Sequence, residues 1–144
     1  MATLEKAIAV AVQAHQGQVD KSGVPYILHP LRLMLRLEQD EERIIAVLHD
    51  VVEDTPVTFA ELERMGFSPA VMETLDRLTH RKEESYDAYL QKILPHPVAR
   101  KIKMLDLEDN MDIRRLDHQC MDSDWARLKK YRSAWALLQG LPSA

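Results

Sequence analysis

The sequence predicts an all-helical fold: one domain over residues 1–144, arranged as an irregular bundle of about seven or eight short helices. Apolar residues recur at the three- and four-residue spacing of a helix face, and the alternation typical of strands is absent over any useful length. Only four glycines occur, and helix formers dominate. A length of 144 residues fits one domain and leaves little room for two.

The first half of the chain contains three predicted helices. Apolar positions in residues 3–16 lie on one helix face. Turn-forming residues in Gly17–Pro25 predict a loop. Pro30 suits the first turn of a helix that runs to about Leu37, because its missing N–H has no partner there. A strongly apolar segment predicts the third helix over about Glu41–Val52.

Capping residues mark two further helices in the middle of the chain. Thr58 and Glu61 have the spacing of a capping box, which opens a short helix that ends near Gly66. The dipeptide Ser68-Pro69 supplies an N-cap and a proline at the first helical position of the next one. Both helices are therefore predicted from their starts rather than from a long apolar pattern.

Three more helices are predicted in the last third of the chain. Ser85 can cap a helix that ends near Leu94, and Pro97 opens the next. The last helix is expected over Trp125–Leu138. Its expected caps and stop signals are, in chain order, Ser123 or Asp124, Gly140 and Pro142.

Charge and composition argue against nucleic-acid and membrane partners. The formal net charge is −4, with 19 basic and 23 acidic residues mixed along the chain, which gives no field that attracts nucleic acid. Basic residues near positions 100–103 and 127–132 are therefore expected to be solvated helix faces. No apolar run approaches the ~18 residues of a membrane span. The single cysteine, Cys120, cannot form an internal disulfide, so we expect the protein to be located in the reducing cytoplasm.

The apolar segment 44–54 carries an unusual group of charged side chains. His49 and Glu53 are four residues apart, as are Asp50 and Asp54, so each pair would share a helix face. Charges in an apolar helix are costly unless they are paired or bound to a metal, and a divalent ion would also relieve repulsion between the carboxylates. The alternative is a solvated helix C-terminus, although acidic residues there oppose the helix dipole.

Two further positions could complete such a site. Asp106 lies four residues after Ile102 and borders a buried face, with Asn110 one turn further on. Alternatively, Asp106 is exposed and paired with Lys103. His29 lies in an otherwise apolar stretch, where it is either a metal ligand or a satisfied core histidine.

The remaining histidines fit structural or surface roles. His15 is expected to make a structural or supporting hydrogen bond, and His80, His96 and His118 are expected at the surface. The chain has no glycine-rich phosphate loop, no Gly-x-Ser-x-Gly elbow and no Cys-x-x-Cys or His-Glu-x-x-His motif. These absences leave metal-assisted hydrolysis or no catalysis.

The order of these residues resembles a known family. His29-Pro30 is followed by His49-Asp50-Val51-Val52-Glu53-Asp54-Thr55, and then by Lys103-Met104-Leu105-Asp106 with Asn110-Met111. This order resembles the HD superfamily of phosphohydrolases, and more narrowly the hydrolase domain of the RelA/SpoT family and its small stand-alone relatives. The approach segment, Lys21 to Pro30, also fits. The resemblance runs from about residue 6 to residue 117, which is most of the chain.

The resemblance implies an all-helical HD-type domain and a role for each matching residue. The implied ligands of one Mn²⁺ ion are His29, His49, Asp50 and Asp106. The implied catalytic residues are Glu53 and Asp54. Lys21 and Ser22 would hold phosphate, and Asn110 would bind the nucleoside. Two imidazoles and two carboxylates form a mixed N/O donor set that suits Mn²⁺ or a similar divalent ion.

The resemblance also implies a reaction: a Mn-dependent enzyme removes the 3′-pyrophosphate of ppGpp or pppGpp, giving GDP or GTP and pyrophosphate. Two positions depart from the family pattern, because Asp20 and Leu107 stand where these enzymes have basic residues. With Glu108 and Asp109 they suggest an acidic rim, which would disfavour a highly anionic nucleotide. Two alternatives therefore stay open: hydrolysis of another phosphorylated nucleotide, and a non-catalytic, metal- and nucleotide-binding regulatory module.

Overall fold

The computed structural model describes residues 1–140, and in that range the chain forms nine α-helices, one 3₁₀ helix and no β-strand. An isolated bridge joins Val19 to Pro25 in the predicted loop. The predicted all-helical fold is therefore confirmed. The helices are α1 (Leu4–Ala14), α2 (Leu28–Leu35), α3 (Asp40–Leu48), α4 (Val51–Asp54), α5 (Phe59–Arg64), α6 (Pro69–Leu78), α7 (Tyr86–Ile93), α8 (Pro97–Asn110), η1 (Ile113–Arg115) and α9 (Asp122–Gln139).

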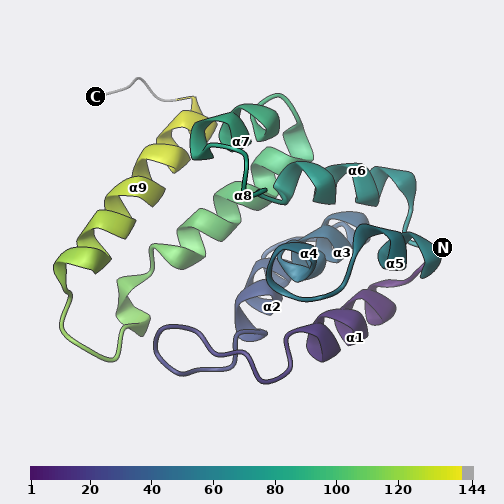
Figure 1. Ribbon diagram of the computed structural model, residues 1–144, viewed down its shortest axis with the longest axis horizontal. Helices are drawn as coiled ribbons and strands as arrows, with labels where there is room; N and C mark the ends of the chain where they lie inside the picture. The colour runs from purple at the N-terminus through teal and green to yellow at the C-terminus, as the bar shows by residue number, and fades with distance from the viewer. Residues whose placement is uncertain (141–144) are drawn as a thin grey trace.

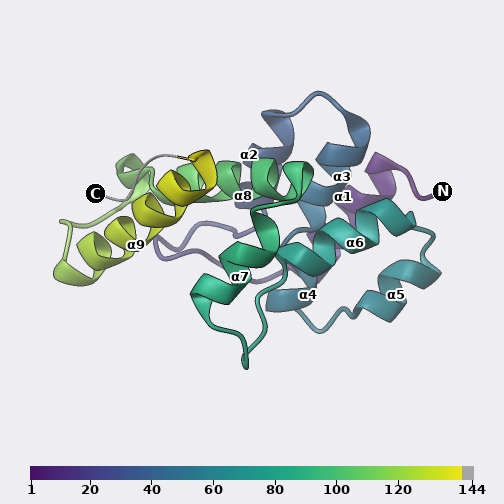
Figure 2. The same cartoon turned by 90° about the horizontal axis from the view of Figure 1, so that it is seen from above.

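Helix α3 is the most enclosed element of the bundle. It contacts α1, α2, α6 and α8, and its residues 44–48 are all buried. Burial on every side explains why this segment is apolar throughout rather than on one face. Helices α1 to α6 gather on one side of the molecule, while α9 runs beside α8 on the other (Figures 1 and 2).

The predicted caps open their helices as expected. Thr58 and Glu61 form a reciprocal capping box at the start of α5. The hydroxyl of Ser68 accepts the N–H of Val71 at 3.2 Å at the start of α6, and Ser85 caps α7 in the same way. Short polar motifs therefore set these helix starts, because they satisfy N–H groups that have no partner inside the helix.

The predicted helix over Glu41–Val52 is wrong in one respect: it breaks at His49 and Asp50. Helix α3 ends one residue before His49, and α4 starts one residue after Asp50. Nδ1 of His49 lies 2.6 Å from the carbonyl oxygen of Ala46, which the N–H of Asp50 would use in a continuous helix. The imidazole occupies this acceptor and the chain turns, which adds one helix to the number expected.

The last helix starts earlier than predicted. Its N-cap is Met121, not Ser123 or Asp124. The carboxylate of Asp124 points back and accepts the N–H of Met121 at 2.8 Å. Asp124 is therefore the third helical residue of a capping-box arrangement rather than the cap itself.

The end of α9 lies where the sequence predicts it. Gly140 ends the helix in the left-handed conformation, with φ of 81°, which a residue without a Cβ adopts easily. The other predicted stop signal, Pro142, lies outside the described residues. Within residues 1–140, none of the helices is long and apolar enough to cross a membrane.

Candidate metal centre

The four residues predicted to bind a metal come together from three parts of the chain. His29 is in α2, His49 and Asp50 form the turn between α3 and α4, and Asp106 is in α8. Each offers one ligand atom, and these atoms all lie within 4.8 Å of one another. Three of the four side chains are buried and Asp50 is half-buried. The structure thus contains a cluster that could hold a divalent metal ion.

Both imidazoles turn the same nitrogen toward this cluster. Nδ1 of His49 faces the carbonyl oxygen of Ala46, and Nδ1 of His29 lies 2.6 Å from a carboxylate oxygen of Asp109. These acceptors favour a proton on Nδ1, so each ring can present an Nε2 lone pair to a metal ion when one binds. Nε2 of His49 is buried and makes no hydrogen bond within residues 1–140, although Oδ2 of Asp50 lies 3.0 Å away. A cation at the centre would satisfy it, so the residues fit a metal ion.

The two carboxylates are held ionised. Asp50 accepts a hydrogen bond from the hydroxyl of Tyr26 and lies 3.0 Å from Nε2 of His49. Burial alone would raise the pKa of Asp50, but the imidazole of His49 outweighs it and lowers that pKa to about 2. Burial also opposes ionisation of Asp106, yet the ammonium of Lys103 and the two imidazoles hold its pKa well below its usual range. Ionised carboxylates are the form that binds a metal.

Asp106 divides its two oxygens between different partners. Oδ1 lies 2.9 Å from Nε2 of His29 and accepts the amide N–H of Asn110 at 3.0 Å. Oδ2 accepts a hydrogen bond from Nζ of Lys103 at 2.7 Å. One oxygen of Asp106 is therefore presented to the cluster, and the other is occupied by a lysine.

The acidic residues after Asp106 do not form the acidic rim that the sequence suggests. Asp109 faces His29 on one side and the guanidinium group of Arg32 on the other, at 2.8 and 2.9 Å. The side chain of Glu108 pairs with Arg36 at 2.8 Å. Both charges are therefore neutralised locally. Asp109 could not be predicted from sequence as a partner of His29, because only the packing of α8 against α2 brings them together.

The predicted catalytic residues lie on α4, directly after the cluster. Carboxylate oxygens of Asp50, Glu53 and Asp54 lie within 4.8 Å of one another. Glu53 accepts the backbone N–H of His80 at 2.7 Å, and burial raises its pKa. Partial burial and the carboxylates of Asp50 and Glu53 raise the pKa of Asp54 to about 6. These two acids therefore hold protons more readily than free carboxylates do.

Two adjoining cavities open beside the cluster. The smaller has a volume of about 220 Å³ and is lined by polar side chains, among them Asp50, Glu53, Asp54 and Asp106. The larger, of about 600 Å³, extends toward the loop before α2 and the segment between α8 and α9. Both are bordered by Tyr26, Asp54, Asn110 and Tyr131. The two cavities therefore form one cleft with the candidate metal centre at its narrower end.

The three predicted substrate-binding residues all border the larger cavity: Lys21, Ser22 and Asn110. The hydroxyl of Ser22 donates to the carbonyl oxygen of Arg115 at 2.9 Å. The carboxylate of Asp20 accepts the N–H groups of Ser22 and Val24, at 2.8 and 3.0 Å, and so shapes the turn that carries Lys21. Asp20 thus has a structural role in this loop.

Several residues of the cleft were missed or misread from sequence. Lys103 was expected on a solvated face, but it lies against Asp106, and the i, i+3 spacing of the two was the available signal. His80 was expected at the surface, but its ring stacks on Tyr89 with centroids 4.8 Å apart. The cationic residues that border the cleft without having been predicted are Lys103, Arg115, Arg127 and Lys130.

The other histidines follow the predictions more closely. His15 is buried and hydrogen-bonds through Nδ1 to Gln18 at 2.8 Å, and Gln18 in turn donates to the carbonyl oxygen of Asp54. His15 therefore has the supporting role that we expected. His118 is exposed as predicted. His96 is half-buried and accepts the N–H of Ala99 as the N-cap of α8, so its surface assignment was only partly right.

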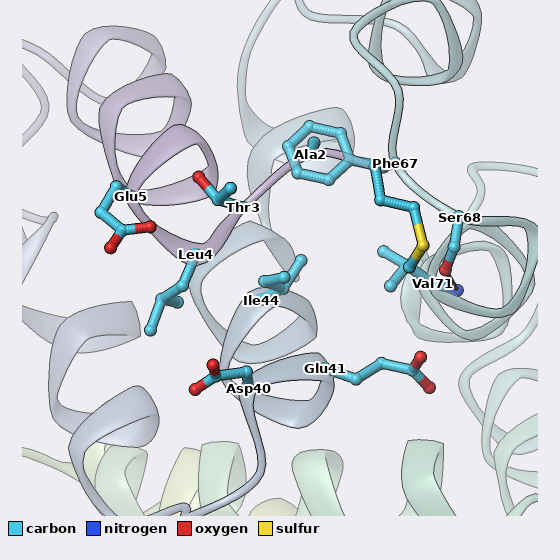
Figure 3. A pocket seen from close by; sticks show the side chains of 11 residues that line it. Ala2, Thr3, Leu4, Glu5, Asp40, Glu41, Ile44, Phe67, Ser68 and Val71 are labelled. Carbon is cyan, nitrogen blue, oxygen red and sulfur yellow. Dashed lines mark hydrogen bonds between the residues drawn. The ribbon is translucent and has the colours of Figure 1, made fainter.

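A third cavity, of about 510 Å³, lies away from the cluster, where the starts of α1, α3 and α6 meet (Figure 3). None of its lining residues belongs to the candidate metal centre. The charged side chains in its lining are the carboxylates of Glu5, Asp40 and Glu41. This lining contains no lysine or arginine side chain, whereas the cleft beside the cluster contains several, so the cleft is the better site for a phosphorylated nucleotide.

Comparisons with known proteins show which proteins this chain resembles. No protein-family model matches the chain. The chain is similar to the bifunctional (p)ppGpp synthase/hydrolase SpoT of Escherichia coli K12, at 36% identity over 123 residues that cover 75% of this chain. It is also 36% identical over 117 residues, 76% of this chain, to a guanosine-3′,5′-bis(diphosphate) 3′-pyrophosphohydrolase of Aquifex aeolicus. The chain spans 17% of the length of either relative.

A solved structure supports the fold. The chain is similar to a protein described as a metazoan ortholog of SpoT that hydrolyses ppGpp, with a TM-score of 0.78 and 21% identity. The match covers 99% of this chain and 89% of the other. This likeness confirms the all-helical fold, and the sequence similarities confirm the predicted resemblance to the RelA/SpoT enzymes.

Proposed function

We propose that this protein is a metal-dependent phosphohydrolase that removes the 3′-pyrophosphate of ppGpp or pppGpp, giving GDP or GTP and pyrophosphate. The observation that carries this proposal is the buried Nε2 of His49, which makes no hydrogen bond within residues 1–140 and faces a cluster of histidine and aspartate beside a polar cleft. The activities for which the relatives are named favour this substrate over other nucleotides. In this proposal the substrate is a small molecule, and the protein acts on it in the cytoplasm.

His29, His49, Asp50 and Asp106 are the proposed ligands of a single Mn²⁺ ion. When bound, such an ion lowers the pKa of a water molecule and neutralises a phosphoryl oxygen. The protein keeps both imidazoles oriented through the acceptors at their Nδ1 atoms, which are Asp109 and the carbonyl oxygen of Ala46. The donor set is thereby preorganised before any ion arrives.

Glu53 and Asp54 are the proposed acid–base residues. Hydrolysis forms a bond between a water oxygen and the 3′-phosphorus, and breaks the bond from that phosphorus to O3′. The water loses a proton to a carboxylate, and O3′ gains one as it leaves. Asp54 suits this exchange because one of its carboxylate oxygens lies within 4.8 Å of a carboxylate oxygen of the proposed ligand Asp50, close to where an activated water would lie. The N–H of His80 holds the carboxylate of Glu53 in place at 2.7 Å.

The larger cavity is the proposed position of the nucleoside and its 5′-phosphates. Lys21 and Ser22 would contact phosphate there, and Asn110, which borders both cavities, would lie near the ribose. A volume of about 600 Å³ lies within the range of about 300–1,000 Å³ that small-molecule sites occupy. Arg115 and Arg127 add positive charge to the same lining.

A second candidate substrate is another phosphorylated nucleotide. The observation that favours it is Asp20, which stands where the guanosine tetraphosphate hydrolases have a basic residue. Asp20 is an acid whose carboxylate shapes the turn of its own loop. This position therefore supplies no positive charge to a nucleotide. The chemistry at the metal centre would be unchanged, and only the contacts to the nucleoside would differ.

The test is pyrophosphate release by the purified protein with Mn²⁺, across ppGpp, pppGpp and nucleotides that carry a 2′- or 3′-phosphate. We expect rapid release from ppGpp that stops when a chelator removes the metal. The double variant Glu53→Gln with Asp54→Asn should keep its metal and lose turnover, whereas Glu63→Gln, an exposed acid on α5, should match the parent. Turnover of other nucleotides alone would reassign the substrate, and metal binding without turnover would leave a regulatory module.

A further inference from the structure

The smaller cavity contains two cations that the proposed mechanism does not use. Its lining includes Lys103 from α8 and Lys130 from α9. The remaining charged residues of this lining are carboxylates of the metal centre and of the catalytic pair, and the imidazole of His80 also lines it. Two lysines from neighbouring helices therefore border the same small space as the candidate metal centre.

Lys103 is almost fully enclosed, with 12% of its side chain exposed. Enclosing an ammonium group is costly unless its N–H groups have acceptors. Its Nζ donates to Oδ2 of Asp106 at 2.7 Å and lies 5.2 Å from the ring centre of Tyr89. Among residues 1–140 this is its one hydrogen bond, although an ammonium has three donors. Lys103 can thus donate to a ligand in the cavity as well.

Lys130 and Tyr86 meet at the same cavity. Nζ of Lys130 lies over the ring of Tyr86, 4.1 Å from its centre. This cation–π contact holds the ammonium in place without neutralising its charge, and Lys130 has no carboxylate partner in the described part of the chain. The hydroxyl of Tyr86 is also buried and lacks a hydrogen-bond partner among the described residues. A cation and a tyrosine with an unused hydroxyl therefore line one polar space.

We propose that Lys103, Lys130 and Tyr86 form an anion subsite that holds the pyrophosphate end of the substrate, and then the pyrophosphate product. This inference rests on the proposed function, which it deepens. Ammonium and hydroxyl groups are donors suited to phosphate oxygens. Within residues 1–140, Lys103 has N–H donors that make no hydrogen bond, and the hydroxyl of Tyr86 has no hydrogen-bond partner.

The size of the cavity determines which part of the substrate it accepts. A volume of about 220 Å³ is below the range of about 300–1,000 Å³ found for whole small-molecule sites. It suits a phosphate chain, whereas the adjoining cavity of about 600 Å³ has room for a nucleoside. The candidate metal centre borders the smaller space through Asp50 and Asp106, so the bond to be broken would lie between the two cavities.

The test is calorimetric titration of inorganic pyrophosphate, and separately of inorganic phosphate, into the full chain loaded with Mn²⁺ and freed of excess metal. We expect pyrophosphate to bind more tightly than phosphate. Lys130→Met and Tyr86→Phe should each weaken pyrophosphate binding by about tenfold, which is the worth of one charge-assisted hydrogen bond. The matched control is Lys129→Met, an exposed neighbour outside this lining, which should leave binding unchanged.

Lys103→Met should weaken pyrophosphate binding by about ten- to a hundredfold. Its metal content and circular dichroism are measured alongside, because Lys103 also contacts Asp106. If Lys103→Met fails to fold, Lys130→Met and Tyr86→Phe decide the matter. Pyrophosphate binding that equals the parent's in those two folded variants would overturn the subsite.

The proposed function and the subsite can fail separately. If the parent releases pyrophosphate from ppGpp but the variants bind pyrophosphate as the parent does, the subsite is wrong and the proposed function stands. If the parent leaves ppGpp intact but binds pyrophosphate through Lys103 and Lys130, the subsite stands and the substrate is wrong.

Discussion

A carboxylate oxygen of Asp109 lies 2.6 Å from Nδ1 of His29, and the opposite nitrogen of that ring faces the candidate metal centre. Asp109 is itself fixed by Arg32, whose guanidinium group donates to both of its oxygens. Burial opposes the ionisation of Asp109, yet His29 and Arg32 hold its pKa well below its usual range. A charged, immobile acceptor therefore sets the orientation and the tautomer of His29.

Asp109→Ala should weaken Mn²⁺ binding although all four proposed ligands remain. Loss of an outer partner of a metal-binding histidine typically lowers metal affinity by about 10–100-fold. Calorimetric titration of Mn²⁺ into the metal-free protein measures this. Glu108→Ala is the matched control, because this neighbouring acid pairs with Arg36 instead. Equal Mn²⁺ affinities in the two variants would show that Asp109 does not support metal binding.

His49→Ala should abolish the stabilisation that Mn²⁺ gives to the fold. An ion at a hundredfold excess over its Kd stabilises the native state by about 2.7 kcal/mol, which corresponds to roughly 5–10 °C in Tm for a chain of this size. Thermal unfolding with Mn²⁺ and with a chelator measures the difference. His118→Ala, an exposed histidine outside the cluster, should keep the full shift. A normal Mn²⁺ shift in His49→Ala would show that His49 is not a ligand.

Local patterns explain how much of this structure could be predicted. Helix starts depend on residues three apart, so Ser68, Ser85 and the pair Thr58 and Glu61 predicted their helices correctly. The His49–Asp50 pair stood out because charge inside an apolar segment needs a partner. These signals all lie within a few residues of sequence.

What could not be predicted depends on contacts between distant segments. Asp109 looked like part of an acidic rim because nothing in the sequence indicates its distance to His29 and Arg32, which lie about eighty positions earlier. The turn at His49 was missed for another reason. It depends on a side chain that replaces a backbone hydrogen bond to Ala46, and helix propensity does not register such a bond.

Leu107→Arg tests whether restoring the family's basic residue would help to bind a nucleotide. Leu107 is fully buried in the core. We expect the arginine to destabilise the protein by about 4 kcal/mol or more, because its charge would have no partner there. Leu107→Met, which nearly conserves volume, should cost less than about 1.5 kcal/mol. Denaturant unfolding measures both. A stable Leu107→Arg protein with faster ppGpp turnover would place this side chain in the cleft.

Asp54 should lower the stability of the metal-free protein at neutral and alkaline pH. Folding raises its pKa from the usual 3.8 to about 6, because partial burial and two neighbouring carboxylates disfavour its charge. Below about pH 3 the carboxyl is protonated in both the folded and unfolded states, so it exerts no effect on stability. Above about pH 6 the ionised form is penalised only in the folded state, and the full penalty applies.

Asp54→Asn removes that penalty, so it should stabilise the metal-free protein at pH 8 and leave stability unchanged near pH 3. Asp54 is exposed to the cleft, and solvent screening reduces the expected gain to about 1 kcal/mol, or about 3 °C in Tm. Thermal unfolding of both proteins with a chelator at the two pH values measures it. Mn²⁺ should shrink the difference, because a nearby cation stabilises the charged carboxylate. An equal gain at both pH values would attribute the effect to packing, and the raised pKa of Asp54 would then play no part in it.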